Sequence, residues 1–176
     1  MRHLLLTWTD RGGATVPTRA RAADDQGPIL RLLAQPESAG RYDAACVLTT
    51  AAALPATRDL VRQMKATVPQ VDLRVLDVAD PSDYGPLFHA LGPVCRDLRR
   101  SHRAPAWDVD VLLSAGTPQA QTLWVIWVQA GLLSARMLQV IPPQFVPSPH
   151  PHAIRVVRLD IEGFPEVRAL RSEVQR

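Results

Sequence analysis

The sequence predicts an α/β domain of the Rossmann-like, doubly wound kind, in which helices cover both faces of a mainly parallel, six-stranded sheet. Short apolar segments alternate with amphipathic segments along the chain. The apolar segments are bounded by turn residues such as Gly, Pro, Asp and Ser, as strands usually are. Because parallel strands are joined by helical crossovers, this alternation is typical of a parallel sheet.

The expected strands and helices can be placed from these patterns. Strands are expected at residues 4–9, 43–49, 71–78, 136–141 and 154–161, with one more beginning at Val109. Helices are expected at residues 28–35, 54–67 and 165–174, with two others beginning at Asp80 and Pro118. The helix from Asp80 ends in a basic group that suits the negative end of a helix dipole: Arg96, Arg99, Arg100 and Arg103. We expect this group to be solvated, with RNA contact as the alternative.

Composition indicates one globular domain over residues 1–176. Hydrophobic residues make up 47% and charged residues 21%, which is typical of a chain with a sizeable core. The net charge of +3 is too small to predict nucleic-acid binding by charge alone. Cys46 and Cys95 fit no zinc or redox spacing, so we expect buried thiols. Neither a signal peptide nor a membrane span is evident, so we expect a cytoplasmic protein without membrane contact.

The most informative segment is the predicted turn Ser114-Ala115-Gly116-Thr117-Pro118, between an apolar strand and a helix. Gly116 can adopt backbone angles that other residues avoid, Thr117 is a good helix N-cap, and Pro118 suits the first helical position. Such a turn leaves backbone N–H groups free at the positive end of a helix dipole, which makes a cradle for phosphate. The alternative is an ordinary, well-capped βα turn.

A second segment is expected to meet this turn. In doubly wound sheets, ligands bind beyond the carboxyl ends of the strands, where the strand order reverses. In the common order that point lies between the first and fourth strands, so the loops after both should converge. The expected ligand-binding residues are Thr7, Trp8, Thr9, Asp10, Arg11, Gly12, Ser114, Ala115, Gly116, Thr117 and Gln119. Trp8 is expected either to pack or to stack on a purine, and at most one of Thr7 and Thr9 should face the ligand.

Several common chemistries lack their motifs. Neither G-x-G-x-x-G nor a Walker A motif is present, which argues against a dinucleotide or P-loop site. Lys65 is the single lysine and lies within a predicted helix, away from the turn. His150 and His152 stand in a Pro-rich loop without a clear carboxylate or cysteine partner, so we expect them to be exposed to solvent. We therefore expect neither a metal nor a cofactor.

The segment from Asp110 to Pro143 resembles a known family. Its Ser-Ala-Gly-Thr-Pro-Gln-Ala-Gln-Thr-Leu-Trp run, beginning at Ser114, and its Ala-Arg-Met-Leu-Gln-Val-Ile-Pro-Pro run, beginning at Ala135, are similar to the CARF (CRISPR-associated Rossmann fold) domain. The similarity is greatest to the N-terminal regulatory domain of RtcR-type sigma-54-dependent activators of RNA-repair operons. Residues 154–161 and the C-terminal helix also resemble the end of that domain.

The resemblance implies a homodimeric sensor in which the loops of two copies face each other across a two-fold axis. Many CARF domains bind cyclic oligoadenylates in the groove shared by the two copies, whereas RtcR-type members are thought instead to sense a product of RNA damage, such as an RNA end or fragment. The implied roles are CRISPR-linked antiviral defence, RNA repair and transcription regulation. Some CARF domains carry lysine after Gly-Thr where this chain has Pro118, so a cationic contact to phosphate is lost there.

The functional expectation is a ligand-sensing regulatory domain that binds a cyclic oligoadenylate or RNA-derived nucleotide. The alternative is a metal-independent ring nuclease, in which Arg11 would supply a cation and Thr9 or Ser114 a hydroxyl. A third interpretation is a structural subunit with a vestigial groove. Because no Walker or helix-turn-helix motif is present, we expect a stand-alone sensor or the sensor part of a regulator whose effector domain or subunit lies elsewhere. The apolar face formed by Leu123, Trp124 and Trp127 is expected to be covered, either in the core or at a contact between two chains of a homodimer.

Overall fold

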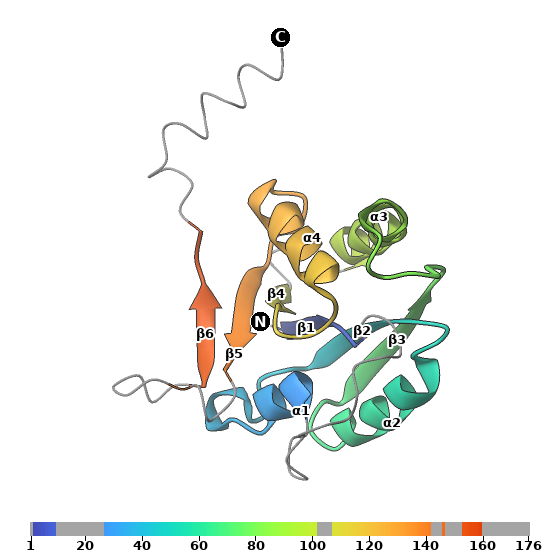
Figure 1. The fold of residues 1–176 in the computed structure, drawn as a ribbon. Helices are drawn as coiled ribbons and strands as arrows, with labels where there is room; N and C mark the ends of the chain where they lie inside the picture. Colours follow the sequence, from blue (N-terminus) through green and yellow to red (C-terminus); the bar gives the residue numbers. More distant parts are fainter. Residues whose placement is uncertain (1, 10–26, 102–106, 142–145, 147–152, 160–176) are drawn as a thin grey trace.

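The computed structural model describes residues 2–9, 27–101, 107–141, 146 and 153–159 (Figure 1). Its elements, in chain order, are β1 (Arg2–Trp8), α1 (Gly27–Leu33), the 3-10 helix η1 (Pro36–Ser38), β2 (Ala44–Thr50), α2 (Leu54–Met64), β3 (Gln70–Leu76), α3 (Tyr84–Ser101), β4 (Trp107–Leu112), α4 (Pro118–Gln129), β5 (Arg136–Val140) and β6 (Ile154–Val157). The sheet has the order β3-β2-β1-β4-β5-β6. Neighbouring strands from β3 to β5 are parallel, and β6 is antiparallel to β5. The predicted doubly wound, mainly parallel six-stranded sheet is confirmed.

The strand order reverses beside β1. The chain runs outward from β1 to β2 and β3, crosses to β4 on the other side of β1, and continues to β5 and β6. Leu6 of β1 lies in register with Val111 of β4, so the loops that follow these two strands begin side by side. The fold therefore places the switch point between β1 and β4, where the sequence predicted it.

Helices cover both faces of the sheet, with α1 and α2 on one face and α3 and α4 on the other (Figure 1). Leu123, Trp124 and Trp127 of α4 are buried in the layer shared with α3. Core packing, one of the two expectations for this face, is confirmed, and the expectation that these three side chains form a dimer face is wrong, because the apolar side of α4 packs on its own sheet. Among the described residues, no helix combines the length and the apolar character needed to cross a membrane.

Several predicted boundaries differ from the structure by one to three residues, and two differ by more. α3 begins at Tyr84 rather than at Asp80, because the Asp80 carboxylate accepts hydrogen bonds from the backbone N–H and the hydroxyl of Ser82, at 2.8 and 2.6 Å, and so forms a turn. β6 is shorter than predicted and contains only four residues. The helix predicted at residues 165–174 lies outside the described residues.

β4 carries a buried charge that the sequence analysis treated only as part of an apolar strand. Arg136 of β5 donates to both oxygens of the Asp110 carboxylate, from Nε at 2.8 Å and from Nη2 at 2.7 Å. Arg41 Nε, at 3.3 Å, and the Tyr42 hydroxyl, at 3.0 Å, donate to Asp110 Oδ2. Burial, reinforced by the Asp110 charge, raises the pKa of Tyr42 above its ordinary range, so its hydroxyl remains a donor. This cluster joins β4, β5 and the segment before β2.

Cys46 of β2 and Cys95 of α3 are buried free thiols, as predicted. Burial raises the pKa of each thiol to about 12. Since the thiolate is the reactive form, we expect a thiol-specific disulfide reagent at about pH 8 to leave both cysteines of the native protein unlabelled and to label both after denaturation. The labelling is measured through the absorbance of the thiol that the reagent releases. Labelling of the native protein as fast as that of free cysteine would contradict this burial.

Candidate functional site

The turn between β4 and α4 has the geometry of an anion cradle. Gly116 has a φ of +88°, in the left-handed region that favours glycine. Thr117 caps α4 by accepting a hydrogen bond from the Ala120 N–H at 3.1 Å, and Pro118 is the first helical residue, as predicted. The backbone N–H groups of Gly116 and Gln119 donate to no acceptor in the described part of the chain. The first turn of α4 holds no acidic residue that would neutralise the positive end of its dipole.

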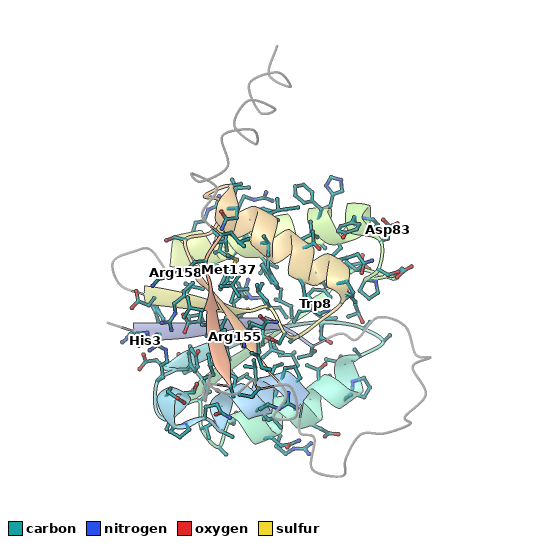
Figure 2. All side chains as sticks on the ribbon, turned by 60° about the vertical axis from the view of Figure 1, so that its left-hand side comes forward. His3, Trp8, Asp83, Met137, Arg155 and Arg158 are labelled. Carbon is teal, nitrogen blue, oxygen red and sulfur yellow. The ribbon has the colours of Figure 1, made fainter. Side chains whose placement is uncertain are left out.

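Trp8 lies under this turn. A Cβ atom on Gly116 would lie 2.7 Å from Trp8 Cδ1 and 3.0 Å from Trp8 Cβ. The Trp8 side chain is fully buried, and its indole N–H has no acceptor among the described residues. Figure 2 shows Trp8 below α4. The ring therefore packs beneath Gly116 instead of offering a face for base stacking, and its N–H, bonded to Cδ1, is a buried donor next to the turn.

The two hydroxyls of the turn are engaged within the domain. Ser114 Oγ donates to the Val140 carbonyl at 3.1 Å and accepts from the Val140 N–H at 2.7 Å. Thr117 Oγ1, in addition to capping α4, donates to the Pro81 carbonyl at 2.9 Å. Ser114 thus joins the ends of β4 and β5, and Thr117 joins α4 to the loop after β3. The donors that the turn offers to a ligand are backbone N–H groups.

Threonine hydroxyls hold the end of β1 on the α2 side of the sheet. Thr9 Oγ1 lies 2.8 Å from Thr57 Oγ1 and 3.2 Å from the Leu48 carbonyl oxygen. Thr49 Oγ1 also lies 2.8 Å from Thr57 Oγ1. Thr7 is fully buried, and its hydroxyl has no partner among the described residues. Thr9 is therefore the more accessible of the two threonines that were expected at the site.

The other expected site residues are only partly described. Ala115 is buried in the turn, and Gln119 is partly buried in the first turn of α4. Five of the candidate ligand and metal residues lie outside the described residues: Asp10, Arg11, Gly12, His150 and His152. Within the described ranges, no three His, Cys, Asp or Glu side chains gather as a metal site would need.

A groove of about 410 Å³ adjoins the cradle between α4 and the β5–β6 edge. It shares Ser114 and Pro118 with the turn and is also lined by Gln121 of α4 and Gln139 of β5. Neither Gln121 nor Gln139 was predicted as a site residue from the sequence. Alternation along β5 could have placed Gln139 on the face opposite to Leu138, but only the packing of α4 shows that the two glutamines line one groove.

The fold and this site define a Rossmann-like domain whose switch point carries a glycine turn with unbonded backbone N–H groups at the start of α4. No protein-family model matches the chain, and no curated protein matches it. Among solved structures, the fold is similar to that of Enterococcus italicus Csm6 bound to cyclic hexa-2′-fluoro-hexa-dAMP, with a TM-score of 0.71 and 13% sequence identity. The match covers 97% of this chain and 44% of the Csm6 chain, so this chain spans less than half the length of Csm6.

Proposed function

We propose that this chain is a CARF-type ligand-sensing domain that binds a cyclic oligoadenylate, or an RNA-derived nucleotide end, through a phosphate held on the cradle. The observation that carries this proposal is the pair of unbonded N–H groups of Gly116 and Gln119 at the positive end of α4. They lie where the strand order reverses, which is the usual ligand position in such sheets. Csm6 is a CARF-domain protein of similar fold, and its structure was solved with a cyclic hexa-adenylate analogue bound. This similarity supports a cyclic oligoadenylate as the class of ligand.

The proposed working form is a cytoplasmic homodimer. A cyclic ligand with repeated phosphates suits two cradles that face each other across a two-fold axis. Ligand binding would change the geometry of the dimer and so signal to an effector domain or subunit, as in RtcR-type regulators of transcription. The sequence similarity that supports this finer role lies in residues 110–143.

We favour a sensor over a ring nuclease because of how the hydroxyls of the turn are used. Ser114 is hydrogen-bonded to β5 on both its donor and acceptor sides. Thr117 is likewise engaged, with Pro81 and with Ala120. Neither hydroxyl is free to assist attack on a phosphodiester. The cradle therefore supplies phosphate binding without an evident general base in the described part of the site.

Titration calorimetry tests the proposal with cyclic tri-, tetra- and hexa-adenylate and with a linear oligoadenylate that ends in a 2′,3′-cyclic phosphate. We expect at least one of them to bind, with one cyclic ligand for every two chains. Adenosine, which lacks phosphate, is the control and should bind far more weakly. Absence of binding by all four phosphate-bearing ligands would contradict the proposed function. One cyclic ligand per single chain would contradict the shared dimer site.

The same ligands decide between sensing and cleavage. After hours with excess cyclic ligand in metal-free buffer, we expect chromatography to show less than one turnover per dimer, because the described part of the site offers no evident general base to assist attack on the phosphodiester. Multiple turnovers that disappear in the Arg11→Ala variant would favour the ring nuclease.

A further inference from the structure

The groove beside the cradle has the dimensions and lining of a base-binding subsite. Its volume of about 410 Å³ is within the range of small-molecule pockets. Val125 of α4 and Val157 of β6 provide apolar walls. The polar side chains are Ser114, Thr122 and two glutamines, and the hydroxyls of Ser114 and Thr122 are already bonded to Val140 and to the Pro118 carbonyl. Because the groove shares Ser114 and Pro118 with the turn, a nucleotide whose phosphate lies on the cradle can place its base there without a long linker.

Gln139 is the polar group in this groove that is free to recognise a ligand. It is exposed on β5, and its side-chain amide has no partner within the described ranges. Gln121, in contrast, donates from Nε2 to the Gly116 carbonyl at 3.3 Å and so supports the cradle. A carboxamide offers one acceptor and two donors side by side, which matches the amino group and the neighbouring ring nitrogen of adenine. Guanine presents two acceptors at the equivalent edge and cannot satisfy the amide oxygen.

We propose that this groove binds one adenine base of the ligand and that Gln139 is the residue that recognises its edge. The inference rests on the proposed function, because the phosphate on the cradle brings the base to the groove. The apolar side chains of Val125 and Val157 contact the ring, and the Gln139 amide pairs with the exocyclic amino group and a ring nitrogen.

Arg155 of β6 provides a cation next to Gln139, beside the residues that line the groove. It lies directly opposite Gln139 in the antiparallel register of β5 and β6, so the two side chains project from the same face of the sheet. Arg155 is exposed, and none of the described residues forms an ion pair with it. Figure 2, in which the β6 edge comes forward, labels Arg155 on this side of the molecule. Arg155 is placed to contact the phosphate that follows the bound base.

The inference is tested by replacing Gln139 in the protein and adenine in the ligand. The probes are cyclic tetra- or hexa-adenylate, whichever binds the native protein more tightly, and the same ring with purine in place of adenine, which lacks only the exocyclic amino groups. We expect the purine ring to bind the native protein about tenfold more weakly and to bind the Gln139→Leu variant as tightly as the adenine ring does. Gln63, an exposed glutamine on α2, supplies the control, and Gln63→Leu should keep the native ratio.

The ratio of two dissociation constants on one variant does not depend on how much of that variant is folded, so partial unfolding cannot imitate the result. A native-like ratio in Gln139→Leu would overturn the inference and leave the proposed function standing. Failure of the native protein to bind any adenylate ring would overturn both. If Gln139→Leu changed the sedimentation coefficient of the unliganded protein and left the ratio unchanged, the groove would be a contact between two chains, and the adenine assignment would be wrong.

Discussion

Replacing Gly116 by valine is expected to destabilise the domain by about 3 kcal/mol or more and to abolish ligand binding at the cradle. The backbone at Gly116 has a φ of +88°, where a side chain costs about 1–2 kcal/mol and a β-branched one is a clear outlier. The new Cβ would also lie 2.7 Å from Trp8 Cδ1, so the buried indole or the turn must move. The shifts of side chain and backbone that accommodate such overpacking typically cost about 1–3 kcal/mol more.

Gly131 allows the cost of the positive φ to be separated from the cost of the collision with Trp8. It has a φ of +70°, but a Cβ atom there would meet nothing within 4 Å. Gly131→Ala therefore carries only the backbone cost, whereas Gly116→Ala carries the backbone cost and the collision with Trp8. We expect urea denaturation to show the larger loss of stability for Gly116→Ala. Equal losses for the two variants would mean that Trp8 does not fill the space under Gly116.

The same pair of variants separates stability from binding. Gly131→Ala should retain the affinity of the native protein for the adenylate ligand, because Gly131 follows the far end of α4. Gly116→Ala displaces the N–H groups that form the cradle and should weaken binding strongly, when measured under conditions in which both variants are folded. Native affinity in Gly116→Ala would show that the ligand binds elsewhere.

Removing the Asp110 carboxylate is expected to have the second largest effect. Asp110→Ala leaves the guanidinium groups of Arg41 and Arg136 without their shared anion and the buried Tyr42 hydroxyl without its acceptor. Breaking a fully buried ion pair costs about 3–5 kcal/mol. Because the Arg136 side chain is 41% exposed and can be rehydrated, we expect a loss of about 2–3 kcal/mol in the free energy of unfolding.

Asp59 provides the matched control. It pairs with Arg62 on the surface of α2 at 3.1 Å, and both side chains are largely exposed. Exposed pairs contribute about 0–1 kcal/mol, so Asp59→Ala should leave the unfolding midpoint in urea almost unchanged. If Asp110→Ala were as mild as Asp59→Ala, the cluster around Asp110 would not stabilise the fold.

Local patterns were sufficient to predict most of the fold and the framework of the site. The positive φ of Gly116, the cap at Thr117 and the helix start at Pro118 depend on neighbours within a few residues, and all three are present. The start of α3 was less predictable, because Asp80 bonds to Ser82 and forms a turn that competes with the helix. Proline and aspartate favour both a turn and a first helical turn, so composition alone could not choose between them.

The roles of individual site side chains depended on partners far away in the sequence. Ser114 is bonded to Val140, 26 residues later, and Thr117 to Pro81, 36 residues earlier. A hydroxyl at a turn has the same sequence signature whether it faces a ligand or a neighbouring strand. Tertiary packing therefore decided that these two hydroxyls support the turn and that the Gly116 and Gln119 N–H groups are left without an acceptor among the described residues.

By itself, the sequence determined the order of strands and helices, the doubly wound sheet and the cap of α4, because periodicity and local hydrogen bonding act over a few residues. Only the tertiary structure decided that Trp8 packs beneath Gly116, that Asp110 is neutralised by Arg41 and Arg136, and that Gln139 lines a groove with α4. Each of these contacts joins segments that become neighbours only when parallel strands and their helices assemble. No local sequence pattern encodes which residue of a distant segment will contact a given side chain in the folded domain.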